Sequence, residues 1–164
     1  MAIVTAQAAI KAIEKKFGKE AIVGKKVDVE FVSTGVLSFD LALGGGFAKG
    51  RIVELYGWES SGKTTLALEL AAQVNSLGGK VAFIDMENAI DLGYAEALGV
   101  KIDFEKDDFI LSQPDDGETA LELMREFLKS EEIQLIILDS VGALLPKSVI
   151  QGEAGDAKMG VQAR

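Results

Sequence analysis

A glycine-rich segment, residues 57–65, constrains the fold of this chain more than any other feature. It reads Gly57-Trp58-Glu59-Ser60-Ser61-Gly62-Lys63-Thr64-Thr65 and fits the pattern of a glycine, four free positions, a second glycine, a lysine and a serine or threonine. Residues 51–56 before it alternate and predict a strand, while residues 66–74 behind it are helix formers throughout. A glycine loop between a strand and a helix turns backbone N–H groups towards a phosphate at the positive end of the helix dipole.

We therefore interpret residues 57–65 as a nucleotide site. In this interpretation Lys63 carries a mobile positive charge to the β- and γ-phosphates, and Thr64 offers its hydroxyl to Mg²⁺. The alternative, a glycine-rich turn with a chance lysine, leaves the matching flanks unexplained.

Composition limits the chemistry that is available to the chain. Its 164 residues are 48% hydrophobic, which predicts one domain with a real core. There is no cysteine and no histidine, so catalysis would use carboxylates, lysine, hydroxyls and metal. The longest apolar runs are strand-sized and the start lacks the pattern of a secretory signal, so we expect a cytoplasmic protein without a membrane segment.

The net charge of −9 is unevenly distributed. Residues 1–26 hold six lysines against two glutamates, so the rest of the chain is more acidic than the total suggests. Bulk attraction to nucleic acid needs clustered lysine and arginine, so any such binding would be local.

Residues 5–18 predict an amphipathic helix that ends at Gly18. Its apolar stripe would pack either on its own domain or, as an arm, on a neighbouring subunit, and the sequence pattern favours neither.

Strand and helix patterns alternate along the rest of the chain. A short helix is expected over residues 37–43, capped by Ser33-Thr34-Gly35 and stopped by the glycines at 44–46. Strands are expected at residues 80–85, 109–112 and 133–140, and helices at residues 92–98 and 118–129. Of the strands, residues 133–140 look the most buried. The order predicts an α/β fold with a mostly parallel sheet and helices on both faces.

Acidic residues at strand ends are the candidates for chemistry. Asp139 ends a hydrophobic strand downstream of the phosphate loop, as a Walker B aspartate does, and would hold Mg²⁺ together with Thr64. Glu87 follows the end of the strand at residues 80–85 and is our candidate for orienting the attacking water. Asp85, Glu59 and Asp91 are the alternatives for that role.

Two further segments carry weaker patterns. Tyr94 and Asp91 lie three residues apart and would suit an adenine, although ordinary helix packing is the favoured interpretation from these residues alone. Residues 150–160 contain three glycines without a period and predict a loop.

Taken together, several segments follow one another in the order and spacing of the bacterial RecA recombinase family. They are Ser33-Thr34-Gly35, Leu41–Gly44, Gly50–Gly57, Glu59–Thr65, Phe83-Ile84-Asp85 with Glu87, Ser112-Gln113-Pro114, Asp139-Ser140-Val141, and Gly155-Asp156 with Met159-Gly160. The chain thus resembles this family over nearly its whole length, which implies a RecA-like P-loop NTPase fold preceded by a helical arm.

The resemblance implies an ATP-dependent filament on single-stranded DNA that pairs and exchanges strands with homologous duplex DNA in recombinational repair. It implies catalytic roles for Glu87 and Lys63, and Mg²⁺ ligands at Thr64 and Asp139. The implied nucleotide-binding residues are Gly57, Trp58, Glu59, Ser60, Ser61, Gly62, Lys63, Thr64, Thr65, Asp91, Tyr94 and Ser140.

Other implications concern partners and domains. Met159, Gly160 and Arg164 occupy positions near the DNA backbone, and the helix at residues 5–18 resembles the family's subunit-docking arm. The expected domains are the arm at residues 1–32 and an ATPase core at residues 33–164 that is incomplete at its C-terminal end.

The chain also departs from the family pattern. Trp58 stands where proline is usual and Asn88 where histidine often follows the glutamate, and we expect both to tune the loops without removing a ligand. Because the family's core continues further, we expect this sequence to be an N-terminal portion of a recombinase. The alternatives are a catalytically incomplete filament-binding module and another motor of this fold, such as a hexameric helicase.

Overall fold

A computed structural model describes residues 4–21, 28–103 and 105–150 of the chain. The chain divides into two compact units, residues 1–30 and residues 31–164. Among the described residues, no helix is both long and apolar enough to cross a membrane.

The first unit contains one amphipathic helix, as predicted. Helix α1 (Ala6–Phe17) begins where the Thr5 hydroxyl accepts a hydrogen bond from the backbone N–H of Ala8, and it ends at Gly18 with φ of 91°. A short 3₁₀ helix, η1 (Lys19–Ala21), follows. The described residues of this unit leave the apolar stripe of α1 uncovered, with Phe17 at 66% and both Ile10 and Ile13 at 39% of their full accessibility.

The second unit begins with a small antiparallel sheet of two strands. Strand β1 (Phe31–Val32) pairs antiparallel with β2 (Phe47–Ala48), and α2 (Leu37–Leu43) lies between them in the chain. The helix stops at Gly44, which adopts the left-handed conformation, as expected. A side chain at Gly46 would overlap the backbone carbonyl of Val32, so glycine is required there.

The predicted cap of α2 is wrong in its details. Val36 is the N-cap residue and no side chain caps it among the described residues. Instead, the Thr34 hydroxyl and backbone N–H both donate to Asp40, at 2.7 and 2.8 Å, and the Ser33 hydroxyl donates to the same carboxylate at 2.6 Å. Ser33 and Thr34 therefore hydrogen-bond to the Asp40 side chain within the helix and not to the backbone N–H groups of its first turn.

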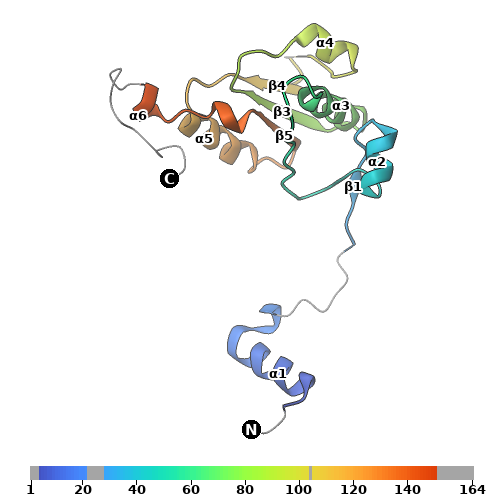
Figure 1. Ribbon diagram of the computed structural model, residues 1–164, viewed down its shortest axis with the longest axis vertical. Helices are drawn as coiled ribbons and strands as arrows, with labels where there is room; N and C mark the ends of the chain where they lie inside the picture. Colours follow the sequence, from blue (N-terminus) through green and yellow to red (C-terminus); the bar gives the residue numbers. More distant parts are fainter. Residues whose placement is uncertain (1–3, 22–27, 104, 151–164) are drawn as a thin grey trace. The chain divides into compact units, whose positions relative to one another are not determined.

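The main sheet has three parallel strands in the order β4-β3-β5 (Figure 1). These are β3 (Lys80–Asp85), β4 (Phe109–Ser112) and β5 (Ile133–Asp139). The helices are α3 (Lys63–Ser76), α4 (Leu92–Ala97) and α5 (Gly117–Phe127), and the described part ends with η2 (Val141–Ala143) and α6 (Lys147–Ile150). The α/β class and the predicted positions of these three strands and of the long helices are confirmed.

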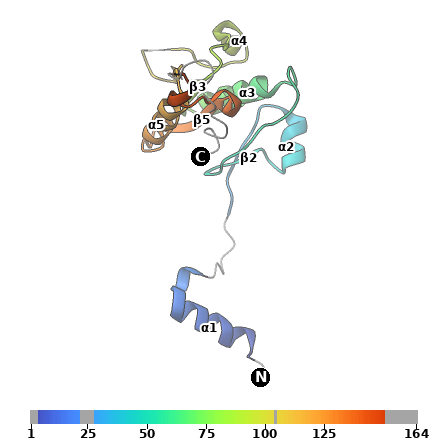
Figure 2. The same cartoon turned by 60° about the vertical axis from the view of Figure 1, so that its left-hand side comes forward.

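Helices pack on both faces of this sheet. Helix α3 contacts β3 and β5, and its buried Leu68 shares a core cluster with Val81 and Phe83 of β3. Side chains alternate along a strand, so Ala82 and Ile84 point to the opposite face, where both are fully buried. Helix α5 contacts β5, beside which it lies in Figure 2.

Two expectations about strands are wrong. Residues 51–56 form no strand, and among the described residues they pair with no other segment; Ile52 and Tyr56 are 101% and 89% exposed. An alternating pattern makes a strand only when a neighbour satisfies its backbone groups. In addition, β3 is the most buried strand, whereas β5 lies at an edge with only Ile137 buried.

The register of the sheet brings the ends of three strands together. Asp85 of β3 lies opposite Asp139 of β5, and Ile84 lies opposite Ser112 of β4. Parallel strands end at the same edge, and ligands bind beyond that edge in sheets of this kind. The residues that follow β3, β4 and β5 therefore meet in one place.

Candidate functional site

The glycine-rich loop leads directly into α3, whose N-terminus is open. Gly62 is its N-cap residue with φ of 87°, and among the described residues no side chain caps this end. A side chain added to Gly62 would meet nothing within 4 Å, so its left-handed backbone is what favours glycine there. Helix ends of this kind present unpaired N–H groups and a positive dipole to an anion.

Lys63 lies folded over its own loop. Its ammonium group donates to the carbonyl oxygens of Gly57 at 3.2 Å and Trp58 at 2.9 Å. These two hydrogen bonds therefore hold the Lys63 ammonium group next to the loop at the uncapped N-terminus of α3. Trp58 is 91% exposed, and Glu59, Ser60 and Ser61 on the same loop are also exposed.

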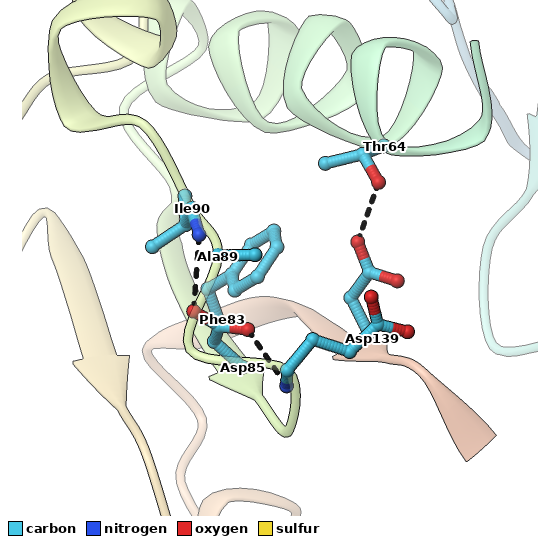
Figure 3. Close-up of a pocket in the computed structure, with 7 residues that line it drawn as sticks. Thr64, Phe83, Asp85, Ala89, Ile90 and Asp139 are labelled. Atoms are coloured by element: carbon cyan, nitrogen blue, oxygen red, sulfur yellow. Dashed lines mark hydrogen bonds between the residues drawn. The ribbon is translucent and has the colours of Figure 1, made fainter. Parts of the chain in front are cut away.

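Thr64 and Asp139 meet across the site. The Thr64 hydroxyl, in the first turn of α3, donates to Asp139 Oδ2 at the end of β5 at 2.6 Å (Figure 3). A hydroxyl and a carboxylate are hard oxygen ligands of the type that Mg²⁺ prefers, and Mg²⁺ is commonly held by one or two protein groups with the phosphates of its substrate. The residues present therefore fit a magnesium ion.

Glu87 lies beside these two residues. Its Oε1 accepts a hydrogen bond of 2.6 Å from the hydroxyl of Ser140, the residue after Asp139. The backbone N–H of Met86 donates to the Asp139 carbonyl at 2.7 Å, which continues the pairing of β3 with β5 by one residue. Glu87 and Asp139 are thus held next to one another from neighbouring strand ends.

A cavity of about 60 Å³ lies between these groups. Figure 3 shows it bordered by α3, by the end of β5 and by the loop after β3. Its lining residues are Thr64, Phe83, Asp85, Glu87, Ala89, Ile90 and Asp139. The predicted metal ligands and the predicted catalytic glutamate therefore border one cavity.

The predicted adenine residues lie at the start of α4. The Asp91 carboxylate caps this helix by accepting from the backbone N–H of Tyr94 at 3.0 Å. The Tyr94 hydroxyl donates to Thr65 Oγ1 at 3.3 Å, and the side chain is 44% exposed. Tyr94 therefore stands beside the phosphate loop with an accessible ring.

The segment after Ser140 is attached to the beginning of α5. The N–H of Gly117 donates to the Leu145 carbonyl at 2.8 Å, and the N–H of Lys147 donates to Glu118 at 2.9 Å. Burial raises the pKa of Asp116, but hydrogen bonds from Thr119 and the charge of Lys147, 3.6 Å away, together bring this pKa below its usual value. The segment that follows the site is thus anchored by α5.

A family model of the RecA N-terminal domain matches residues 4–164. The chain belongs to the RecA family. It is 52% identical over 162 residues to Protein RecA of Geobacter sulfurreducens, which covers 95% of this chain and 47% of that protein. It is 54% identical to Protein RecA of Rickettsia africae and 50% identical to that of Synechocystis, over 46% and 44% of their lengths. The chain thus spans a little under half the length of these curated relatives.

The RecA resemblance and the RecA-like fold that the sequence predicted are confirmed by these matches. The functional roles of individual residues stay predictions, although the structure brings most of them together. Met159, Gly160 and Arg164, the predicted DNA-binding residues, lie outside the described residues.

One polar residue of this RecA site was given no role from the sequence. The Gln113 amide, just after β4, donates to Asp85 Oδ2 at 3.0 Å. The signal that could have found it is its position, because it follows a parallel strand that ends at the same edge of the sheet as β3. Phe83, Ala89 and Ile90 also line the cavity without having been predicted to do so.

Proposed function

We propose that this chain binds ATP with Mg²⁺ between the phosphate loop and Asp139, as the nucleotide-binding part of a DNA recombinase. The observation that supports this most is the hydrogen bond of 2.6 Å between Thr64 and Asp139, which lie 75 positions apart in the chain. The two oxygen ligands come from different elements, α3 and β5, whose packing brings them together beyond the edge of the sheet.

Each residue has a separate task in the proposed site. The loop N–H groups and Lys63 hold the phosphates, after the Lys63 ammonium exchanges its contacts with Gly57 and Trp58 for phosphate oxygens. Thr64 and Asp139 would hold Mg²⁺, which neutralises charge on the β- and γ-phosphates when it is bound. The exposed ring of Tyr94 and the Asp91 carboxylate take the adenine.

Glu87 is the proposed group that orients the attacking water. Its carboxylate lies on the cavity and is held at one oxygen by Ser140, which leaves the other oxygen to accept a proton from water. Because Ser140 follows Asp139 directly, the metal ligand and the water-orienting group are joined through one peptide bond and one hydrogen bond.

The proposed partners of the whole protein are single-stranded DNA and homologous duplex DNA, in the cytoplasm. Met159, Gly160 and Arg164 would contact the DNA backbone, and the arm at residues 1–32, which contains α1, would dock on the neighbouring protomer of a helical filament. The apolar stripe of Ile10, Ile13 and Phe17, which the described residues of its own unit leave uncovered, supports the second of these, because such a stripe needs a partner to be buried. In this proposal, ATP hydrolysis depends on DNA.

The first experiment uses Trp58, which is the only tryptophan in the sequence and lies on the phosphate loop. ATP with Mg²⁺ is expected to change its fluorescence saturably. Lys63→Met removes the charge that reaches the phosphates and should abolish the change at the same concentrations, while Lys11→Met, which removes a lysine from α1, should leave it unchanged. A change of equal size in the Lys63→Met variant would contradict the proposed site.

The second experiment measures ATP turnover with and without single-stranded DNA. The proposal expects faster turnover with DNA. Equal, measurable rates in both conditions would count against coupling to DNA.

The exposed stripe of α1 also favours a second candidate, in which the chain joins RecA filaments without hydrolysing ATP. Co-sedimentation with full-length filaments and absent turnover would support it. A monomer that stays in the supernatant would exclude it.

A further inference from the structure

The carboxylate of Asp85 is buried at the end of β3 and accepts three hydrogen bonds. The residue is 2% exposed, and its partners are three neutral N–H groups. Oδ1 accepts from the backbone of Glu87 at 3.1 Å, and Oδ2 accepts from the backbone of Ile90 at 3.2 Å and from the amide of Gln113 at 3.0 Å. Burying a carboxylate is costly unless it is hydrogen-bonded, so these three hydrogen bonds offset the cost of burying Asp85.

Two of the three hydrogen bonds define the shape of the loop that carries Glu87. Asp85 binds the loop near its start, at Glu87, and at its end, at Ile90, so one side chain closes it. Asn88, between them, has φ of 52°, a left-handed conformation that asparagine tolerates better than most residues. Figure 3 shows Asp85 inside this loop, with the Ile90 N–H directed at its carboxylate.

Together with the hydrogen bond from Ser140 to Glu87, these bonds connect all three strand ends. Gln113 follows β4 and donates to Asp85 on β3; the loop after Asp85 carries Glu87; and Glu87 accepts from Ser140, which follows β5. Glu87 is therefore fixed from two sides, through its backbone by Asp85 and through its carboxylate by Ser140.

We infer that Asp85 is a positioning residue for the water-orienting Glu87, and that Gln113 holds Asp85 in this role. This inference rests on the proposed function, and it assigns to Asp85 a task other than binding metal or water. Three of the roughly four lone-pair sites of its carboxylate are already occupied. Asp139, which lines the same cavity as Asp85, accepts one side-chain hydrogen bond within the described residues, from Thr64.

The variant Asp85→Asn tests the inference with almost no change in size. One oxygen becomes an NH₂ group, which cannot accept from a backbone N–H. If the NH₂ group takes the place of Oδ2, the hydrogen bond from Ile90 is lost, and if it takes the place of Oδ1, the hydrogen bond from Glu87 is lost. In either orientation, one of the two bonds that close the loop is lost. We expect kcat for ATP to fall by about 10- to 100-fold, as misplacement by an ångström does, with the Kd for ATP and Mg²⁺ changed less than about threefold.

A matched control is available two residues beyond Gln113. Asp115→Asn makes the same chemical change at an exposed carboxylate and should alter neither quantity. Gln113→Leu is a second variant that removes the donor to Asp85 without altering a buried charge, and it should lower kcat in the same direction. In a Glu87→Gln background, Asp85→Asn should have no further effect on turnover, because it acts only through Glu87.

Amide hydrogen exchange gives a readout that does not depend on turnover. The N–H groups of Glu87 and Ile90 should be protected in the wild-type chain. Asp85→Asn should lose protection at one or both of them, whereas Asp115→Asn should not. If the Ile90 and Glu87 amides exchange equally in wild type and Asp85→Asn, the inference is overturned, whatever the turnover. If the wild-type chain shows the Trp58 response to ATP but no turnover, the catalytic part of the proposed function fails, and the exchange result still decides the positioning role.

Discussion

Replacing Phe83 by alanine tests whether the strand that carries the site is held by the core described above. Phe83 lies on β3, two residues before Asp85, and is only 1% exposed. Its ring packs against Phe109 of β4 with the ring centres 5.9 Å apart and the planes tilted by 41°. Burial of such a ring contributes about 1.5–3 kcal/mol, the aromatic pair adds about 0.5–1.5 kcal/mol, and a cavity remains after truncation. We expect Phe83→Ala to lower the free energy of unfolding by about 3–5 kcal/mol.

The assay is urea unfolding followed by circular dichroism, with Phe39→Ala as the control. Phe39 on α2 is 46% exposed, so deletion of the same atoms should cost about 1 kcal/mol. A domain is commonly stable by about 5–15 kcal/mol, so neither loss exceeds the usual stability and both can be measured from the urea midpoint. Equal losses for Phe83→Ala and Phe39→Ala, or a loss below about 1.5 kcal/mol at Phe83, would refute this description of the core.

Three further predictions concern the first sheet, pH and the adenine site. Gly46→Ala should lower the free energy of unfolding by about 1–3 kcal/mol or more, since its φ is 112° and its Cβ would overlap a β1 carbonyl; an unchanged urea midpoint would contradict this. Hydrogen bonds from Ser33 and Thr34 hold the pKa of Asp40 below its usual 3.8, so this stabilisation is present above that pH and is lost as the pH falls through the lower, folded value. Asp40→Asn should therefore reduce stability at pH 7, with a difference from wild type that shrinks below pH 3.8 in urea titrations; a difference independent of pH would exclude this. Tyr94→Ala should weaken ATP binding about tenfold with no effect on inorganic triphosphate, whereas Tyr94→Phe should keep the ATP affinity; equal weakening by both variants would argue against stacking.

Local signals in the sequence were sufficient for most helices and strands. The helix after the phosphate loop begins at Lys63 because a glycine in the left-handed conformation precedes it, and β3 ends at Asp85 where the apolar run ends. Such patterns depend on residues a few positions apart, which are visible in a sequence. The convergence of Thr64, Asp139 and Glu87 was also predictable, because parallel strands end at one edge of a sheet.

Properties that depend on a neighbouring strand were not predictable. Residues 51–56 have a strand pattern but lack a partner among the described residues, and the apolar β5 lies at an edge and is only half-buried. Neither fact follows from the composition of the segment itself. The contact of Gln113 with Asp85, 28 positions apart, likewise depends on how two strand ends pack.

The most direct test of the central claim is the effect of Mg²⁺ on ATP binding, followed by Trp58 fluorescence in wild type and in Asp139→Asn. The claim is that Thr64 and Asp139 hold the metal while the loop and Lys63 hold the phosphates. We predict that Mg²⁺ raises the ATP affinity of the wild-type chain about tenfold or more, and that Asp139→Asn loses this increase while it keeps the affinity measured without Mg²⁺. An equal increase in the two proteins would mean that Asp139 does not hold the metal, and the proposed site would be wrong.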